Sequence, residues 1–219
     1  MTLPSTHNRT HNRTHAGPRD PARPLAQALK AWGGERDLWI FGYASLIWRP
    51  EFAAAEQRPA TVHGWHRALE MVSNINRGTP QCHGLVFALV SGGSCRGMAY
   101  RVERERAAAE LTRLWEREMP TGVYDPKWLP CSTAQGRISG LAFTLSRSSP
   151  SFTGRLPDVQ IIDILRRARG RYGSTLDYLL ETSASLARCG IRDREIERLA
   201  RLARDHGLCG DAVSAAASP

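Results

Sequence analysis

The most informative apolar run in the chain spans residues 39–50. It begins with Trp39-Ile40-Phe41 and stops at Pro50, which predicts a buried strand that ends in a tight turn. Small residues dominate the stretch from Gly42 to Ser45, so another group can approach the backbone closely there. Successive N–H groups at such a turn form a concavity that suits a carboxylate or a phosphate.

Further strands are predicted along the first two thirds of the chain. Residues 60–73 alternate loosely between apolar and polar positions, which favours one or two strands. Residues 85–90 are fully apolar, and we expect Ser91-Gly92-Gly93-Ser94 to turn them into a second strand over 95–102 as a hairpin. A second hairpin is expected from residues 123–133 and 137–145, joined through Ala134-Gln135-Gly136.

Residues 103–119 have the pattern of an amphipathic helix. Acidic residues lie at the start and Pro120 follows the end, as is usual at helix termini. At about 100° per residue, Glu118 falls within the apolar arc of this helix, whereas Glu116 falls on the opposite face. We therefore expect Glu118 to face the core, beside the residues that form the apolar arc, Ala107, Leu111 and Leu114.

A glutamate on the apolar face of a helix has two readings. Burial disfavours the charged form and raises the pKa of the carboxyl towards the working pH, where the group becomes a useful acid–base catalyst. Alternatively, Glu118 is a structural residue that pairs with an arginine such as Arg117 or Arg77. The pattern alone leaves both readings open.

Three more helices are predicted after a connector rich in Ser, Pro and Gly over residues 146–157. They span residues 158–169, 174–188 and 193–206, and glycines separate them. Because strands come first and helices later, the order favours an α+β fold. We expect a mixed sheet curled into a small β-barrel with flanking helices and a helical C-terminal part.

The two ends of the chain differ in composition from the middle. Residues 1–36 are poor in large apolar residues and contain the tandem repeat Thr6-His7-Asn8-Arg9, Thr10-His11-Asn12-Arg13, which cannot bury a core. We expect this basic tail to be mostly disordered, up to about residue 24, with a short helix over Leu25–Trp32. The folded domain is expected over residues 37–207, and residues 208–219 are expected to be disordered.

The charge of the chain invites a nucleic-acid hypothesis, since the formal net charge is +9. However, residues 1–36 hold six basic and two acidic residues, and many other arginines alternate with acids, as on a solvated surface. Nucleic-acid binding is therefore not expected as the main role. No run is long enough to span a membrane and the N-terminus lacks an apolar signal region, so we expect a cytoplasmic protein without a membrane partner.

The cysteine and histidine pattern predicts no metal site. The five cysteines are odd in number and scattered, without a C-x-x-C motif, which argues against a disulfide framework or structural zinc. His63 and His66 stand three apart, but no cysteine or carboxylate pattern completes a set of ligands.

Two segments resemble signatures of one family. Phe41-Gly42-Tyr43-Ala44-Ser45-Leu46 is similar to the Phe-Gly-Tyr-Gly-Ser-Leu signature of the γ-glutamylcyclotransferases, and Trp48 and Pro50 follow it as in the glutathione-specific (ChaC-type) branch. Residues 114–119, followed by Gly122-Val123-Tyr124, resemble the second signature, in which the catalytic glutamate follows an arginine and precedes Gly-x-Tyr. Shorter similarities occur at Gly64-Trp65-His66-Arg67, Arg77-Gly78 and Gly97-Met98-Ala99-Tyr100-Arg101.

The resemblance implies an intramolecular reaction. The α-amine of a γ-glutamyl group attacks its own γ-carbonyl and releases 5-oxoproline and an amine, which is cysteinylglycine when the substrate is glutathione. Glu118 carries over as the general acid and base, and neither a metal nor an organic cofactor is implied. The residues implied in substrate binding are Gly42, Tyr43, Ala44, Ser45, Leu46, Ile47, Arg77 and Tyr124. Nothing in the sequence specifies an oligomeric state.

Two positions depart from the family pattern. Ala44 stands where the family usually has glycine, which costs about 1 kcal/mol if that residue needs a positive φ. His83-Gly84-Leu85 replaces a typical Pro-Gly-Arg. Three hypotheses follow: a glutathione-specific enzyme, the same cyclisation on another γ-glutamyl amide or peptide, or a non-catalytic binding protein whose basic tail contacts nucleic acid or another acidic partner. The expected position of Glu118 on the apolar face of its helix argues against the non-catalytic binding protein.

Overall fold

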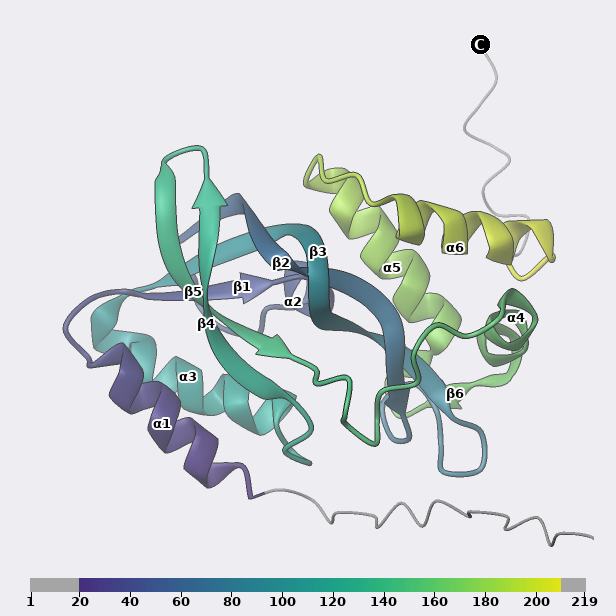
Figure 1. The fold of residues 1–219 in the computed structure, drawn as a ribbon, viewed down its shortest axis with the longest axis horizontal. Helices are drawn as coiled ribbons and strands as arrows, with labels where there is room; N and C mark the ends of the chain where they lie inside the picture. The colour runs from purple at the N-terminus through teal and green to yellow at the C-terminus, as the bar shows by residue number, and fades with distance from the viewer. Residues whose placement is uncertain (1–19, 210–219) are drawn as a thin grey trace, which may run out of the picture.

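A closed five-stranded β-barrel forms the centre of the molecule (Figure 1). The computed structural model describes residues 20–209. Around the barrel the strands follow the order β1 (Leu38–Gly42), β3 (Gly84–Val102), β2 (Glu56–Ser73), β4 (Asp125–Thr133) and β5 (Gly136–Thr144). Parallel pairing of β1 with β5 closes the barrel, whereas β1–β3, β2–β3, β2–β4 and β4–β5 are antiparallel. The predicted α+β class with a mixed sheet curled into a barrel is confirmed.

The long strands β2 and β3 correct one prediction. The hairpin expected at Ser91–Ser94 is wrong, because β3 runs through this stretch and pairs with β2 on both sides of it. Gly92 and Gly93 have φ angles of 105° and 69°, and Gly64 in β2 has a φ of 79°. The register shifts between β2 and β3 at this point, so the glycines allow the two strands to bend together at a bulge.

The second predicted hairpin is confirmed. Strands β4 and β5 pair from Asp125 opposite Thr144 to Thr133 opposite Gly136. The Thr133 hydroxyl donates to the Gly136 carbonyl at 2.8 Å and so fixes the turn.

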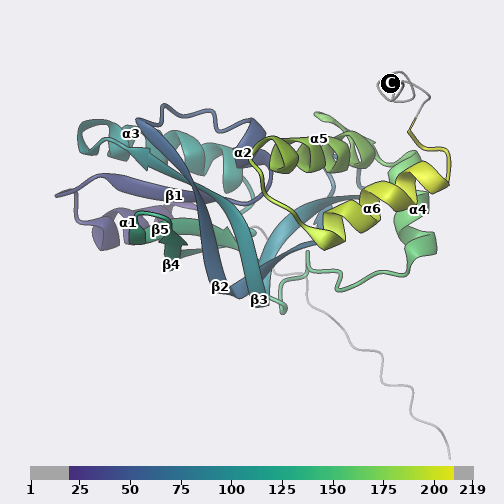
Figure 2. The same ribbon diagram turned by 90° about the horizontal axis from the view of Figure 1, so that it is seen from above.

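Helices cover the barrel on two sides (Figures 1 and 2). On one side lie α1 (Ala22–Trp32) and α3 (Arg104–Glu118), and on the other gather α4 (Asp158–Arg167), α5 (Thr175–Arg188) and α6 (Arg194–Asp205). The four helices predicted after residue 102 are therefore confirmed. The short strands β6 (Arg169–Gly170) and β7 (Gly173–Ser174), which join α4 to α5, were not predicted. No helix within residues 20–209 has both the length and the apolar character that crossing a membrane requires.

Helix α1 extends the folded part towards the N-terminus. It begins at Ala22 rather than at Leu25, so the expected disorder is wrong for residues 22–24. Ala28 is buried, and the indole N–H of Trp115 on α3 donates to the Pro21 carbonyl at 2.9 Å. The disorder expected for residues 1–19 and 210–219 lies outside the described residues.

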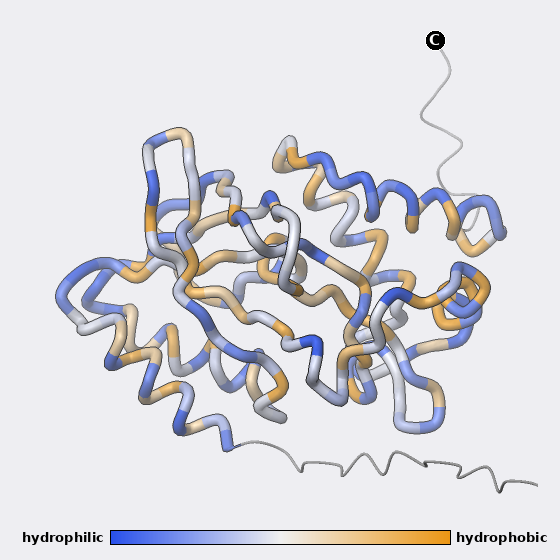
Figure 3. The backbone as a smooth tube through the Cα atoms, in the orientation of Figure 1, coloured by the Kyte–Doolittle hydropathy of each residue, from blue (hydrophilic) through white to orange (hydrophobic). Residues whose placement is uncertain are grey.

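Two apolar clusters meet at the barrel wall. Phe41 belongs to the cluster that contains the buried faces of α4, α5 and α6, whereas Ile40 belongs to the cluster that contains the buried face of α3. Because neighbouring residues of a strand point to opposite sides, β1 is buried on both faces. Along α6, hydrophobic and hydrophilic residues alternate, as expected of a helix with one buried face (Figure 3).

Candidate active site

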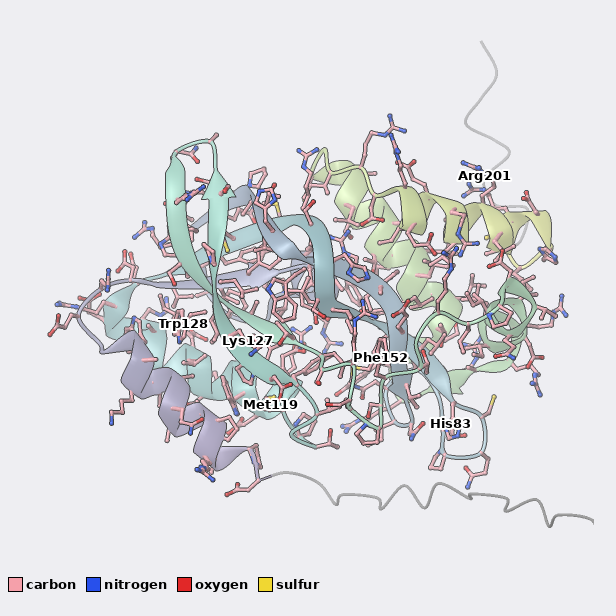
Figure 4. All side chains as sticks on the ribbon, in the orientation of Figure 1. His83, Met119, Lys127, Trp128, Phe152 and Arg201 are labelled. Carbon is pink, nitrogen blue, oxygen red and sulfur yellow. The ribbon has the colours of Figure 1, made fainter. Side chains whose placement is uncertain are left out.

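A pocket lies where the end of β1, the end of α3 and helix α5 meet. Its walls are formed by Tyr43, Ala44, Ser45, Leu46, Phe87, Glu118, Tyr124, Phe143 and Tyr178. Met119, labelled in Figure 4, follows the last residue of α3 and shows where this helix ends. The space is about 290 Å³, part of it open to solvent, which is near the lower end of the range of small-molecule sites.

The segment after β1 forms one wall of the pocket. A single-turn helix, α2 (Ser45–Trp48), follows the strand where a tight turn was predicted. Gly42 is needed beneath it, since a Cβ there would lie 3.0 Å from the Cβ of Leu46 and 3.0 Å from the Tyr100 ring. Ala44 has a φ of −144°, so alanine does not incur the cost of a left-handed conformation. The Ile47 N–H donates to the Ala44 carbonyl at 2.9 Å, whereas the N–H groups before it, at the start of α2, have no partner inside the helix and can serve a substrate oxygen.

Glu118 faces this wall from the last turn of α3. Its side chain is 15% exposed and lines the pocket, whereas Glu116 is exposed, so the predicted orientation is confirmed. Burial raises the pKa of the Glu118 carboxyl, the positive charge of Arg117 opposes the rise, and Glu51 adds to it. The Nε atom of Arg117 lies 3.1 Å from a Glu118 oxygen. The carboxyl thus has the raised pKa expected from burial and also the arginine partner expected of a structural residue.

Arg117 links Glu118 to the opposite wall. Its guanidinium donates to the Ser45 hydroxyl and to the Pro50 carbonyl, both at 3.2 Å, and to the Arg49 carbonyl. It also lies 3.3 Å from a Glu51 carboxylate oxygen. One side chain therefore fixes the distance between the acid–base candidate and the segment around α2.

Three buried tyrosines complete the polar lining. Burial raises the pKa values of Tyr43, Tyr124 and Tyr178, and the negative charge of Glu118 adds to each rise, so the hydroxyls stay neutral. The Tyr43 hydroxyl donates to the Phe143 carbonyl at 2.9 Å, and the Tyr178 hydroxyl accepts from the Phe87 N–H at 3.3 Å. The Tyr43 proton is committed to the Phe143 carbonyl, whereas the Tyr178 hydroxyl, which acts as an acceptor here, can donate its proton to an oxygen that gains negative charge.

Not every residue named from the sequence reaches the pocket. Tyr43, Ala44, Ser45, Leu46, Glu118 and Tyr124 line it. Gly42 lies beneath α2, and the Ile47 carbonyl accepts from the Tyr100 hydroxyl at 3.5 Å. Arg77 lies behind the lining, with its guanidinium carbon 5.1 Å from the centre of the Tyr178 ring.

Three residues that line the pocket were not predicted from the sequence. One of the two positions that depart from the family pattern also lies away from the pocket. Phe87, Phe143 and Tyr178 belong to elements whose periodicity predicts only that they point inward, not that they meet. Leu85 is buried in the core and its N–H donates to the Thr175 hydroxyl at 3.0 Å, so this departure from the family pattern does not reach the lining. Within residues 20–209, no group of three or more His, Cys, Asp or Glu side chains is placed to hold a metal ion.

The fold and the pocket define a class of protein: a closed mixed barrel that presents a buried carboxylate to a pocket with tyrosine hydroxyls. Residues 38–206 match the family model described as ChaC-like protein. This chain belongs to the ChaC-like protein family.

The relatives and one solved structure agree with this assignment. The chain is 35% identical over 173 residues to the glutathione-specific γ-glutamylcyclotransferase of Escherichia coli (strain K12), covering 78% of this chain and 75% of that protein. It is 33% identical to the human glutathione-specific γ-glutamylcyclotransferase 1, covering 76% and 78% of the two chains. The crystal structure of a yeast γ-glutamyl cyclotransferase specific to glutathione superposes with a TM-score of 0.72 at 19% identity, covering 78% of this chain and 97% of that one.

Proposed function

We propose that this protein is a γ-glutamylcyclotransferase that converts glutathione into 5-oxoproline and cysteinylglycine. The observation that carries the proposal is Glu118, a buried carboxyl with a raised pKa that lines the pocket opposite the segment 43–46. The names of the E. coli and human relatives support glutathione as the substrate. The proposal that Glu118 is the catalytic residue rests on its position and on the motif around it.

The reaction needs one group that moves a proton twice. The α-amine of the substrate has a pKa of about 8 as a free group, so it is mostly protonated at pH 7 and must lose a proton before it attacks. Glu118 takes that proton, the amine nitrogen bonds to the γ-carbonyl carbon, and the amide bond to cysteinylglycine breaks. Glu118 then delivers the proton to the departing nitrogen, and it passes the second proton of the new ring nitrogen to the amine of cysteinylglycine, which leaves a neutral lactam. The substrate supplies its own nucleophile, so no serine or cysteine of the protein is consumed.

The opposite wall holds the substrate in the conformation that cyclises. The N–H groups at the start of α2 are suited to the glutamyl α-carboxylate or to the γ-carbonyl oxygen. The hydroxyls of Tyr43, Tyr124 and Tyr178 stay protonated and surround the same space. Such positioning supplies several kcal/mol of the barrier, and donors to the developing oxyanion add about 3 kcal/mol each.

A second candidate is the same cyclisation on a different γ-glutamyl amide or peptide. The observation that favours it is Ala44, which lines the pocket and adds a methyl group where the family usually has glycine. The methyl narrows the wall that faces the substrate, so it alters the fit of the group next to the γ-glutamyl unit.

One assay tests the proposal. Purified protein is incubated with glutathione, and 5-oxoproline and cysteinylglycine are both measured over time. We expect the two products in equal amounts, and a much slower release of 5-oxoproline from γ-glutamyl-alanine. Faster turnover of γ-glutamyl-alanine would favour the second candidate, and no 5-oxoproline from either compound would refute both.

A further inference from the structure

A buried arginine with no role in the reaction described above lies directly behind the pocket wall. Arg67, on β2, has a side chain that is only 1% exposed. Its guanidinium donates to three groups from distant parts of the chain: the Tyr43 carbonyl, the Arg96 carbonyl at 2.6 Å and the carboxylate of Asp193. A buried cation is costly unless it is paired and hydrogen-bonded, and here it is both.

Asp193 fixes Arg67 from the side of the C-terminal helices. One carboxylate oxygen of Asp193 pairs with Arg67, and the other accepts from the N–H groups of Glu195 and Ile196, both at 3.1 Å, as the N-cap of α6. The carboxylate therefore has little freedom to turn. Figure 2 shows α5 and α6 together on one side of the molecule, beside the long strands β2 and β3. A polar connection thus runs from the start of α6 to the pocket wall.

The contact with Tyr43 determines where the next N–H points. A trans peptide is planar, so its C=O and N–H point in opposite directions, and the described chain has no cis peptide bond. With the Tyr43 carbonyl directed at Arg67, the Ala44 N–H points away from Arg67. Ala44 lines the pocket, and among residues 20–209 no backbone carbonyl accepts from its N–H. A cation on the carbonyl side also polarises the amide and strengthens its N–H as a donor.

We propose that Arg67 is a positioning residue for the cyclisation: it orients and polarises the Tyr43–Ala44 peptide so that the Ala44 N–H donates to the γ-carbonyl oxygen as negative charge develops there. This inference rests on the proposed function. It assigns Asp193 the role of holding Arg67 in place. The planar fork of the guanidinium matters here, because it reaches three acceptors at once, whereas a lysine ammonium is a point charge on a flexible stem.

The test compares three variants with the parent protein on glutathione. Arg67→Lys keeps the charge and loses the fork, so we expect kcat to fall about 10–100-fold, less than the loss of a whole oxyanion donor, with little change in KM. Asp193→Asn keeps an N-cap acceptor and loses only the negative charge that pairs with Arg67, and we expect a smaller fall of about 3–10-fold in kcat. Arg101→Lys is the control, since Arg101 bonds Asp37 and Glu56 outside the pocket lining, and its kcat should not change.

A second readout separates positioning from general loss of stability. The amide resonance of Ala44, recorded without substrate, should shift in Arg67→Lys and in Asp193→Asn but not in Arg101→Lys. Unchanged kcat together with an unchanged Ala44 resonance in folded Arg67→Lys would overturn the inference. If Arg67→Lys does not fold, Asp193→Asn decides by the same two criteria. If the parent protein releases no 5-oxoproline, the proposed function fails, and the Ala44 resonance alone decides the orientation of the peptide.

Discussion

The two walls of the pocket are built in different ways. One wall is the last turn of α3, a regular helix that directs Glu118 inward through its own periodicity. The other wall, residues 43–46, lies between β1 and α2 and is held by side chains from elsewhere, with Arg67 at the Tyr43 carbonyl and Arg117 at the Ser45 hydroxyl. The acid–base candidate Glu118 is therefore oriented by its own helix, whereas the wall of residues 43–46 depends on Arg67 and Arg117, which are remote from it in the sequence. Substitutions on the first wall should change the rate without changing the fold, and those behind the second should act through geometry.

The largest effect is expected on the first wall. Glu118→Gln nearly preserves shape but cannot accept the amine proton, so kcat should fall about 10²–10⁴-fold. The binding wall is untouched, so the affinity for glutathione should hold. The measurement is 5-oxoproline release by the purified variant, with Glu116→Gln as the matched control. Glu116 is exposed on the same helix and should tolerate the change. Turnover near the parent rate in folded Glu118→Gln would remove the proposed mechanism.

Glu118→Gln should also change the dependence of stability on pH. A carboxyl whose pKa is raised in the folded state contributes most to stability below its unfolded pKa of about 4.3, and loses that contribution as pH rises through the folded pKa. Glu118→Gln should therefore gain stability relative to the parent protein at neutral pH, and the difference should vanish in acid. Melting curves from pH 4 to pH 7 follow this trend, which a fully solvated Glu118 would not produce.

An intermediate effect is expected where the two walls are linked. Arg117→Gln removes the charge that opposes the rise in the Glu118 pKa, so this pKa should rise further. The acidic limb of the kcat/KM profile should then move to higher pH by about one unit or more, which lowers activity on that limb about tenfold. KM should rise as well, because the Ser45 hydroxyl loses its partner.

A matched substitution on the exposed face of α3 controls for this experiment. Arg113→Gln removes a positive charge that lies 3.7 Å from Glu110 and does not border the pocket. Its pH profile should coincide with that of the parent protein. A limb that moves to lower pH in Arg117→Gln would contradict the role given to Arg117.

The smallest effect is expected far from both walls. Deletion of residues 1–19 should leave turnover and melting unchanged, because that composition cannot contribute to a core. Deletion of residues 1–24 also removes the Pro21 carbonyl and the first turn of α1, so the buried Trp115 N–H loses its acceptor. We expect the longer deletion to lower the free energy of unfolding by about 1–3 kcal/mol. Equal melting curves for the two deletions would show that α1 does not stabilise the barrel.

The difference between the walls also explains what the sequence could predict. The direction of Glu118 follows from local periodicity, which is a property of α3 alone. The roles of Arg67 and Tyr178 depend on tertiary contacts between residues 126 and 91 positions apart, and no local pattern encodes these. The error at Ser91–Ser94 has the same origin, since two glycines with positive φ suit a turn and a bulge equally. Only the choice of partner, the earlier strand β2, decides between them.

The closure of the barrel has a consequence for access to the pocket. The parallel seam is short: β1 meets β5 at Ile40 opposite Leu141, and β3 meets β5 at Leu89 opposite Thr144. Strand pairs with so few bonds open locally at a lower free energy than long antiparallel pairs such as β2–β3. The seam leads to Tyr43, the first residue after β1, and to Phe143 on β5; the Tyr43 hydroxyl donates to the Phe143 carbonyl at 2.9 Å, and both residues line the pocket. Local opening of the seam would therefore break this hydrogen bond and disturb the pocket wall before it disturbs the β2–β3 pair.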